Sequence, residues 1–551
     1  MNNYAFMVFD PLSVDTTAGK NSPKANLTHN CKFILGNANK QLVQRILVFN
    51  GVLPSHDSNF FSIYWSQTFP DFFKRSPSLN VRKKYNSESP NFDISPLQKV
   101  NHFPDSKKYL GNKAALASTI QNSQHYSKFK PFFPQTFVLP EDRESLFNFM
   151  KKNPRQQFIA KPPDGSCGFG IKIVTFDEFY TIKRGYVVSE YISRPLCIDG
   201  FKFDMRVYVL VTSFAPLRAF IYKEGLARFA TESYSTHTKE AFSHLTNATL
   251  NKKSKKWTND FKWKLSELLA EIQLRYNRSE EEIMEKIINV VSITLALVQP
   301  VMSPKTRNYP IDPFFELYGF DLLLDVNFDI WLLEINTNPS LGYDSDVDYQ
   351  VKVPLIAQTL SIVGITDMDP AQLPKTIKVD DIDAFDEEII ENEDDRNEMS
   401  GNGFIRIFPS IRSKLFKNLL YTSKFSTKIT KEKLSPITLG KSLTQQQSSL
   451  VLLRYLAKME QKLRNGELQT KSISKLQNYL INRGFEIERV RKNTRTVLHN
   501  YIIQQRLLIS SKSKEIPDKL EKIIDSKNEI FLAEMLINSP FYILYDCKSL
   551  F

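Results

Sequence analysis

The segment from residue 311 to residue 346 constrains the fold most, because two apolar runs flank a short turn. The runs FDLLLDV and IWLLEIN stand on either side of the turn sequence NFD, which is the pattern of a β-hairpin. Asp321 and Glu334 lie equally far from the centre of that turn, so we expect them to pair across the two strands. Asn336 shares the face of Glu334, since side chains alternate along a strand.

Asp321, Glu334 and Asn336 are therefore predicted to converge on one patch of an otherwise apolar hairpin. Carboxylate and amide oxygens suit a hard cation such as Mg²⁺, which usually also keeps waters and substrate phosphates. The alternative is a hairpin whose polar ends simply face solvent. Leu, Ile and Trp surround these acids, and burying unpaired carboxylates is costly, so we favour the metal site.

A second segment has features of a phosphate-binding loop. The sequence FIAKPPDGSCGFGIKI, from Phe158, places Lys161 at the end of an expected strand and a glycine-bearing loop after it. Glycines let backbone amides approach a phosphate closely, and the lysine supplies positive charge. No helix follows, so this is neither a Walker A loop nor a Rossmann fingerprint. Taken alone, such glycines are more often ordinary turn residues.

A third segment, FKFDMRVYVLV, places Lys202, Asp204 and Arg206 on one face of an expected strand. There Lys202 and Arg206 could bind phosphoryl oxygens, and Asp204 could orient them. The alternative is that the three side chains form the solvated face of an antiparallel strand. Arg228, in KEGLARFAT, would alone be read as a surface arginine, and the HLTN sequence from His244 as a structural turn. Their order along the chain, together with the hairpin acids, indicates a nucleotide held between two sheets with Mg²⁺ on the carboxylate side.

The composition limits the remaining possibilities. At 551 residues the chain should hold two to four domains. Four cysteines are widely spaced without a CxxC pair, which argues against a disulfide scaffold or zinc site and fits a reducing compartment. The N-terminal sequence is a poor signal peptide, and we expect no membrane span.

Positive charge is concentrated in one region. Residues 406 to 495 contain 20 Lys and Arg against five Asp and Glu, a net charge of +15, whereas the whole chain carries +13. Such a region favours a long acidic partner. A solvated helical surface is the alternative. The region has few aromatic residues among its basic ones, so nucleic acid is the less favoured partner.

The motifs together resemble the tubulin–tyrosine-ligase-like family. The similarity rests on QKVNHFPDSKKYLGNKAALA, AKPPDGSCGFGI, SEYISRPLCIDGFKFDMRVYVLVTS, IYKEGLARFAT, HLTN and ELYGFDLLLD…LLEINTNPSL, and covers about residues 40 to 370. It implies an α+β fold, namely an ATP-grasp ligase core, to which we add a C-terminal basic helical extension. The predicted parts are a flexible leader (1–40), a small N-terminal α/β domain (41–105), a central ATP-grasp domain (106–200), a C-terminal ATP-grasp domain with the Mg²⁺ site (201–370), an acidic linker (371–400) and the basic helical extension (401–551).

The resemblance also implies roles for individual residues. The residues similar to nucleotide contacts are Lys161, Gly168, Phe169, Gly170, Ile171, Ser189, Glu190, Tyr191, Ile192, Lys202, Asp204, Thr246 and Asn247. Asp321, Glu334 and Asn336 resemble the Mg²⁺ ligands, and Arg206, Arg228 and Glu334 the catalytic residues. Arg228, Lys262 and Lys352 resemble contacts to the incoming amino acid.

The sequence departs from the family pattern in places. Ser189 stands where the nucleotide hinge often has Gln, and Ala248–Thr249 follow HLTN where Tyr-Ser is common. Cys167 and Phe169 replace a frequent polar or basic pair in the glycine loop. These changes affect expected contacts to adenine, the amino acid and phosphate, but remove no metal ligand.

The activity that the resemblance implies is ATP-dependent addition of glutamate to glutamate side chains of tubulin C-terminal tails, through an acyl phosphate. Glutamate is favoured because YKEGLARFAT and CIDGFKFD resemble the glutamate-adding branch, although NTNPSL is also seen in glycine-adding members. The alternatives are a tubulin glycylase, an ATP-grasp ligase of a small molecule, and a catalytically inactive microtubule- or nucleic-acid-binding protein. The expected cofactors are ATP and Mg²⁺, and the partners are tubulin or microtubules and free L-glutamate. A monomer in the cytoplasm or cytoskeleton, with the cilium or basal body as a further address, is the remaining expectation.

Overall fold

The structure of the protein is a computed structural model. The residues that it describes are 6–12, 29–36, 41–57, 60–70, 95, 97–123, 125–129, 131–162, 170–236, 240–246, 251, 254, 258, 261–306, 313–343, 345–374, 382–410, 416 and 419–420. The predicted flexible leader lies largely outside these ranges, but its described residues contradict the prediction, because Met7 and Phe9 are buried and Lys32–Leu35 form a strand. The basic helical extension lies outside the ranges from residue 421 onward, and its first described residues include a strand, Phe404–Phe408, which corrects the expectation of a helix there.

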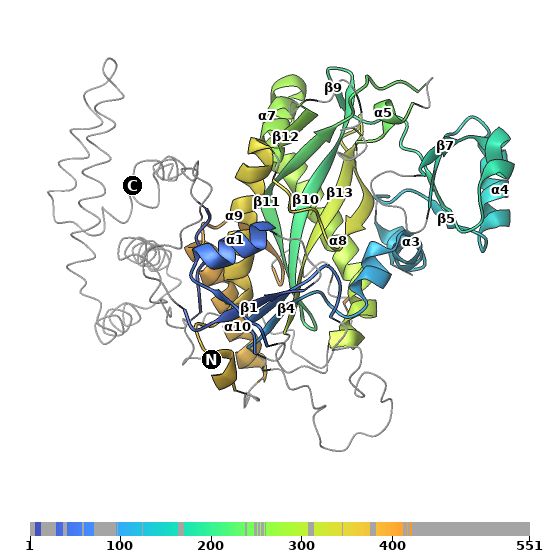
Figure 1. Cartoon of the computed structure of the whole chain (residues 1–551). Coiled ribbons are helices and arrows are strands. Elements are labelled where there is room, and N and C mark those ends of the chain that lie inside the picture. The colour runs from blue at the N-terminus through green and yellow to red at the C-terminus, as the bar shows by residue number, and fades with distance from the viewer. Residues whose placement is uncertain are drawn as a thin grey trace, which may run out of the picture. The chain divides into compact units, whose positions relative to one another are not determined.

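One large sheet dominates the described residues (Figure 1). Its centre is antiparallel and consists of β10 (Phe201–Phe214), which lies between β11 (Leu217–Phe229) and β13 (Phe314–Leu324). The other members are β1 (Lys32–Leu35), β2 (Leu53–Pro54), β3 (Ile63–Trp65), β4 (Lys99–Asn101), β9 (Cys197–Ile198), β12 (Lys262–Lys264), β14 (Ile330–Asn336) and β15 (Phe404–Phe408). The β4 strand pairs parallel to β13 and connects the N-terminal strands to this sheet.

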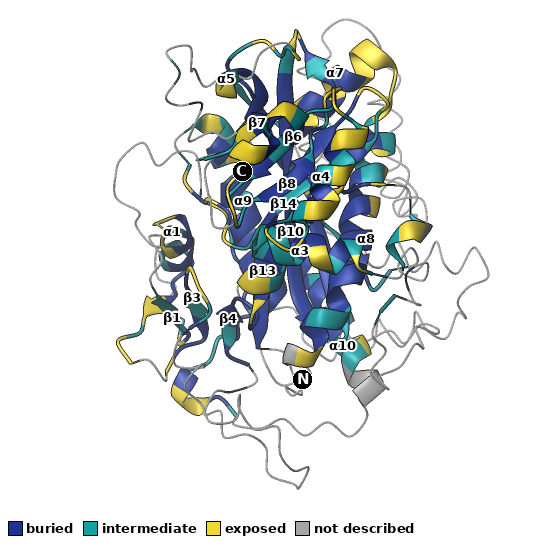
Figure 2. Ribbon diagram, turned by 90° about the vertical axis from the view of Figure 1, so that its right-hand side faces the viewer, coloured by how far each residue is buried: buried dark blue, intermediate teal, exposed yellow. Residues whose placement is uncertain are grey.

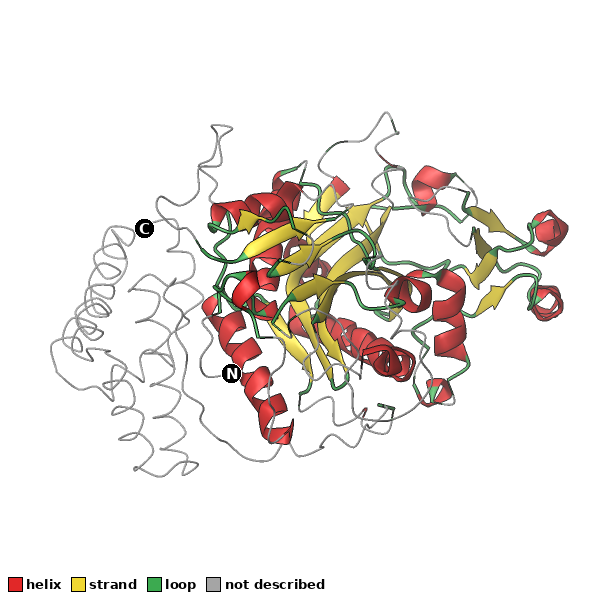
Figure 3. Cartoon of the chain, turned by 60° about the horizontal axis from the view of Figure 1, so that its bottom comes forward, coloured by secondary structure: helices red, strands yellow, loops and turns green. Residues whose placement is uncertain are grey.

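Helices cover both faces of the large sheet (Figure 3). Apolar side chains of β10 that point to one face pack with α3 (Lys113–Gln121), α7 (Leu265–Tyr276) and α8 (Glu280–Thr306). On the other face α1 (Gln41–Phe49) and α9 (Asp346–Val363) form a second core. The central strands are consequently almost wholly buried (Figure 2).

A smaller antiparallel sheet forms a separate apolar core with α4 (Arg143–Lys152). Its strands run in the order β5 (Thr136–Val138), β8 (Val187–Glu190), β6 (Phe158–Lys161) and β7 (Lys172–Val174). A short helix, α5 (Ala241–His244), lies near β10. The helices and the mostly antiparallel central strands make a mixed α/β structure, in agreement with the predicted α+β class.

The hairpin prediction is confirmed. Asp321 of β13 pairs with Glu334 of β14, although a register irregularity follows between Asp321 and Leu322. Asp325 stabilises the turn, because its carboxylate accepts hydrogen bonds from the backbone of Asn327 and from the indole of Trp331. Counting equal distances from the turn therefore gave the correct pair. The five residues between the strands would by themselves shift the register by one residue, and the irregularity after Asp321 restores it.

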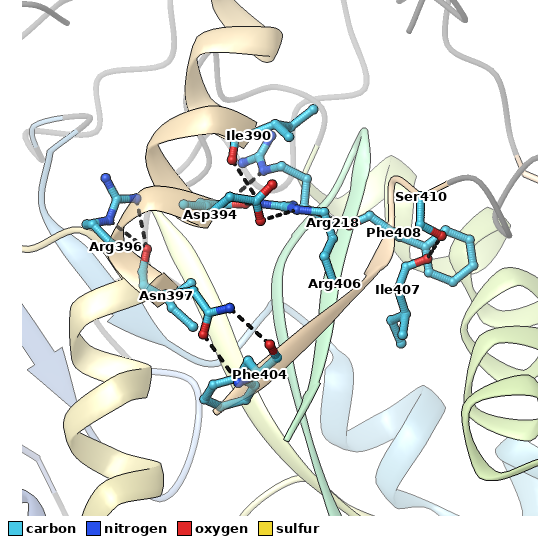
Figure 4. A network of polar contacts seen from close by, with 12 residues as sticks. Arg218, Ile390, Asp394, Arg396, Asn397, Phe404, Arg406, Ile407, Phe408 and Ser410 are labelled. Carbon is cyan, nitrogen blue, oxygen red and sulfur yellow. Dashed lines mark hydrogen bonds and ion pairs between the residues drawn. The ribbon is translucent and has the colours of Figure 1, made fainter. Parts of the chain in front are cut away.

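The acidic segment predicted to be an exposed linker is instead largely a helix, α10 (Ile382–Met399), and this prediction was wrong. Glu393 of α10 is buried and binds Arg218 of β11 and Arg406 of β15, with nitrogen–oxygen distances of 3.4 and 3.1 Å. Asn397 exchanges hydrogen bonds with the backbone of Phe404 (Figure 4). The acidic residues thus neutralise buried arginines, which a count of charges along the chain does not reveal.

The membrane prediction needs one qualification. Residues Glu280–Pro304 of α8 are long and apolar enough to span a membrane by composition, contrary to the expectation that no such stretch exists. However, 72% of the most apolar window is buried inside the protein. Its apolar side chains pack under the large sheet, so α8 is accounted for as a core helix.

Candidate functional site

A cleft between the two sheets brings together residues from five strands, namely β6, β8, β10, β13 and β14. Its walls are Lys113, Phe133, Pro134, Ile159, Lys161, Pro162, Ile171, Ser189, Glu190, Tyr191, Ile192, Lys202, Asp204, His244, Leu245, Thr246, Asp321, Leu323, Leu333 and Glu334. Nine of the residues predicted to bind nucleotide and two predicted metal ligands are among them. The arrangement agrees with the expectation of a ligand held between two sheets.

Some predicted residues cannot be placed in the cleft. Gly168, Phe169 and Asn247 lie outside the described residues. Gly170 is described and has φ +75°, a backbone conformation that suits glycine, and a Cβ there would lie 3.3 Å from Pro162. The glycine loop therefore remains a predicted phosphate contact.

Two lysines supply positive charge to the cleft. Lys161 ends β6, and burial lowers its pKa although Glu334 acts in the opposite direction. Lys202, on β10, is also buried, and burial lowers the pKa of its ammonium group to about 8. Both groups would be stabilised by an anion, because a negative partner offsets the cost of desolvating an ammonium group.

Lys202 is held by a chain of aromatic and polar groups. Its ammonium group donates a hydrogen bond of 3.0 Å to the hydroxyl of Tyr191 and lies 4.7 Å from the centre of that ring. The same hydroxyl lies 2.7 Å from Nδ1 of His244. The HLTN sequence thus contributes His244 to the positioning of Lys202, a role that the sequence interpretation did not assign.

Across the central strands, two aspartates and two arginines form a buried ion network. Asp204 of β10 accepts two hydrogen bonds of 2.7 Å from Arg228 of β11, which is its neighbour in register. Arg228 also lies 2.9 Å from Asp321, and Arg206 binds both oxygens of Asp321. Burial opposes ionisation of Asp321, but the two arginines outweigh it and hold its pKa well below the usual range. Thr246 donates to Asp204 and completes the network.

Glycine at two positions makes room for this network. A Cβ at Gly319 of β13 would lie 2.9 Å from Cδ of Arg206. A Cβ at Gly225 of β11 would lie 2.5 Å from the backbone oxygen of Arg206. Side chains at either position would displace Arg206, so the glycines fix its path toward Asp321.

Lys262 and Lys352, which were predicted to contact an amino acid, share one carboxylate. Asp348 lies 2.5 Å from Lys262 of β12 and 2.8 Å from Lys352 of α9. Sequence reasoning missed Asp348. The signal for it was local: Ser345 caps α9 through the Asp348 backbone, and Asp348 precedes Lys352 by one helical turn.

The predicted metal ligands also converge. The amide nitrogen of Asn336 lies 3.3 Å from Asp321 and 3.5 Å from Glu334, and Lys113 lies 3.6 Å from Glu334. The amide oxygen and nitrogen are interchangeable by rotation of the side chain. Two carboxylates and one amide oxygen are a donor set that fits Mg²⁺. Among the described residues, no cluster of three or more His, Cys, Asp or Glu side chains suits a metal that needs such ligands.

The hinge position differs from the family pattern, and the structure gives its environment. The hydroxyl of Ser189 lies 2.8 Å from that of Thr136 on the neighbouring strand β5. Glu190 accepts a hydrogen bond from Gln156 at 2.8 Å. Ser189 thus has a partner on the neighbouring strand, and Glu190 has one in the segment that precedes β6, so both side chains are held in this wall of the cleft.

Comparison with known proteins identifies the family. The sequence profile of the tubulin-tyrosine ligase family matches residues 89–372, which is just over half of the chain. The chain belongs to the tubulin-tyrosine ligase family. The matched range contains every predicted nucleotide, metal and substrate residue. Family members therefore provide the relevant comparison for this cleft.

Several relatives are glutamylases by name. The chain is 37% identical over 299 residues to the human tubulin polyglutamylase TTLL5, covering 51% of this chain and 23% of that protein. It is 35% identical to the human tubulin monoglutamylase TTLL4 over 296 residues, or 51% of this chain and 24% of the relative. The mouse tubulin polyglutamylase TTLL6 is 30% identical over 405 residues, which cover 68% and 47%. The aligned part thus spans less than half the length of each of these three relatives.

Proposed function

We propose that this chain is an ATP- and Mg²⁺-dependent ligase that adds L-glutamate to glutamate side chains of tubulin C-terminal tails. The observation that carries the proposal is that two lysines and three carboxylates, those of Asp204, Asp321 and Glu334, line one cleft between two sheets. The arginines of the ion network and Asn336 contact these carboxylates. The glutamylase names of three family relatives support tubulin and glutamate as substrates. We further infer that the two sheets form an ATP-grasp core.

The cleft residues divide into a phosphate group and a metal group. Lys161 and Lys202 would bind phosphate oxygens, which also offsets the cost of burying their charges. Asp321, Glu334 and Asn336 would hold Mg²⁺. When bound, ATP and Mg²⁺ supply the phosphoryl group and the charge neutralisation that activate an acceptor carboxylate as an acyl phosphate.

Positioning accounts for the remaining residues. Asp204 fixes the guanidinium group of Arg228 with two hydrogen bonds, so that the arginine presents its positive charge in a defined orientation. Arg206 is fixed by Asp321 in the same way. Such fixed cations can stabilise negative charge that develops at a reacting acyl group without further rearrangement. Lys262 and Lys352 extend the positive surface toward the site proposed for the free amino acid.

The proposal is tested by a ligation assay with purified microtubules, Mg·ATP and either labelled glutamate or labelled glycine. Mass spectrometry of the tubulin tails should detect glutamate adducts, and the attachment points would separate chain initiation from elongation. Glycine adducts would assign the chain to the glycine-adding members. Transfer of neither amino acid, with nucleotide bound, would refute tubulin ligation.

The basic region after residue 406 supports a tubulin substrate through its charge. It would attract acidic tubulin tails and raise their local concentration in a salt-sensitive manner. Deleting residues 421–551 should weaken microtubule pelleting more than turnover on a soluble tail peptide, with the greatest difference at low salt. The cut follows Leu420 because α10, β15 and Phe416 pack on the core. We also propose a monomeric enzyme at cytoplasmic or ciliary microtubules.

A further inference from the structure

A buried hydroxyl group beside the ion network has no partner in the described part of the protein. Tyr208 of β10 is 0% exposed, and its hydroxyl makes no hydrogen bond there. An unsatisfied buried hydroxyl destabilises a folded protein, so it requires an explanation. The ring itself needs none, because it packs in the apolar core beneath α9.

Tyr208 lies where the polar face of β10 meets that core. Asp204 and Arg206 precede it on the same face, and Leu210 follows it in the apolar cluster. Its register neighbour on β13 is Gly319, which contributes no side chain. On the β11 side, the pairing is irregular between Val207 and Val209. Neither neighbouring strand therefore places a side chain directly opposite Tyr208 in regular pairing.

The charges around the hydroxyl identify the neighbourhood. Burial raises the pKa of Tyr208 most, Arg206 and Arg228 act to lower it, and Asp348 and Asp321 act to raise it. The hydroxyl therefore lies within electrostatic range of both ion groups, the network around Asp321 and the lysine pair on Asp348. Register connects the two groups further, because Arg228 pairs with Lys262.

This neighbourhood has an excess of positive charge. In the part of the chain that the structure describes, the ion pairs of four cations, Arg206, Arg228, Lys262 and Lys352, involve three carboxylates, those of Asp204, Asp321 and Asp348. An incoming carboxylate would balance the remaining charge. A neutral hydroxyl that can donate a hydrogen bond is a suitable additional ligand for such a group.

We propose that the Tyr208 hydroxyl donates a hydrogen bond to the carboxylate of the free amino acid held among Arg228, Lys262 and Lys352. Tyr208 is then a determinant of amino-acid affinity. The inference rests on the proposed ligase function and deepens it by adding a substrate contact. Tyr208 lies in the segment FKFDMRVYVLV, but the family resemblance assigns it no role.

The test is Tyr208→Phe, which removes only the hydroxyl. A hydrogen bond to a charged group contributes about 1.5–3 kcal/mol, so the KM for glutamate should rise roughly 10- to 100-fold. The kcat at saturating glutamate and the KM for ATP should stay within about twofold, because the contact exists before and during the reaction. The melting temperature without substrate should not fall, since no protein partner is lost.

The control is Tyr318→Phe. The Tyr318 hydroxyl is also buried, but it donates to Glu316 at 2.9 Å. This variant should lose stability while the KM for glutamate is unchanged. If Tyr208→Phe behaves in the same way, its hydroxyl holds a structural water and the proposal fails. An unchanged KM with unchanged or increased stability would also overturn it.

Direct binding separates this inference from the ligase function. Calorimetry with a non-hydrolysable ATP analogue measures glutamate affinity without an acceptor protein. One outcome is that the unmodified protein binds glutamate, that Tyr208→Phe weakens this binding, and that tubulin is never modified. In that case the proposed ligase function is wrong, but the Tyr208 contact is supported. If the unmodified protein binds neither glutamate nor glycine, the Tyr208 contact is refuted.

Discussion

Neutralising Glu393 tests whether α10 belongs to the folded core. Glu393 is 3% exposed and is the carboxylate between Arg218 and Arg406. Glu393→Gln keeps the shape of the side chain but leaves two buried arginines with less compensation. Breaking a buried ion pair by removing one partner costs about 3–5 kcal/mol. Asp394 still contacts Arg406 at 2.8 Å, so we expect a loss near the lower end, about 3 kcal/mol.

Urea unfolding followed by circular dichroism measures the loss, and Glu387→Gln is the matched control. Glu387 is exposed on α10. Glu387→Gln makes the same chemical change there and should alter the free energy of unfolding by less than about 0.5 kcal/mol. Burial opposes ionisation of Glu393, but Arg218 and Arg406 lower its pKa overall. The stabilisation by Glu393 is therefore present above the pKa that its carboxyl group has in the unfolded chain, and it is lost in acid. The unmodified protein and Glu393→Gln should consequently converge in stability as pH falls. Equal effects of the two substitutions at neutral pH would show that α10 is an exposed linker and refute the reasoning.

Two further predictions concern the cleft. Glu334→Gln should reduce ligation at least about 100-fold by removing metal-binding charge. The melting temperature should change little, because the Glu334 side chain is 27% exposed. Ligation near the level of the unmodified protein would exclude Glu334 as a metal ligand. The pKa of Lys202 is lowered to about 8 by burial, so the free protein loses this positive charge as pH rises through 8, and the KM for ATP should increase above that pH. Lys202→Arg should flatten this dependence, because arginine stays protonated, and an identical pH profile in both proteins would contradict the role of Lys202 in phosphate binding.

The helix α10 shows where sequence reasoning failed. A run of acidic residues indicates a solvated segment when no partner is visible, and the charges of residues 371–400 suggested a linker. The partners, Arg218 and Arg406, lie on β11 and β15, and they come within reach of Glu393 only when β15 pairs with β11. Desolvation and pairing of these charges depend on tertiary contacts, so local composition could not predict them.

What the sequence determined by itself was set by short-range geometry. Alternation along a strand placed Lys202, Asp204 and Arg206 on one face, and this relation needs only the two-residue period of a strand. Counting outward from the turn also gave the pair Asp321 and Glu334, although that pairing depends in addition on the register irregularity after Asp321.

Only the tertiary structure decided which charged groups meet. Arg228 binds Asp204 and Asp321, and Lys262 reaches Asp348 across 86 residues. The Tyr208 hydroxyl is left without a hydrogen-bond partner in the described part of the chain. Many pairings of these acids and bases are compatible with the sequence, since attraction between charges has no fixed spacing along the chain. The order of strands in the large sheet and the docking of α9 select one pairing, and with it the arrangement of the cleft.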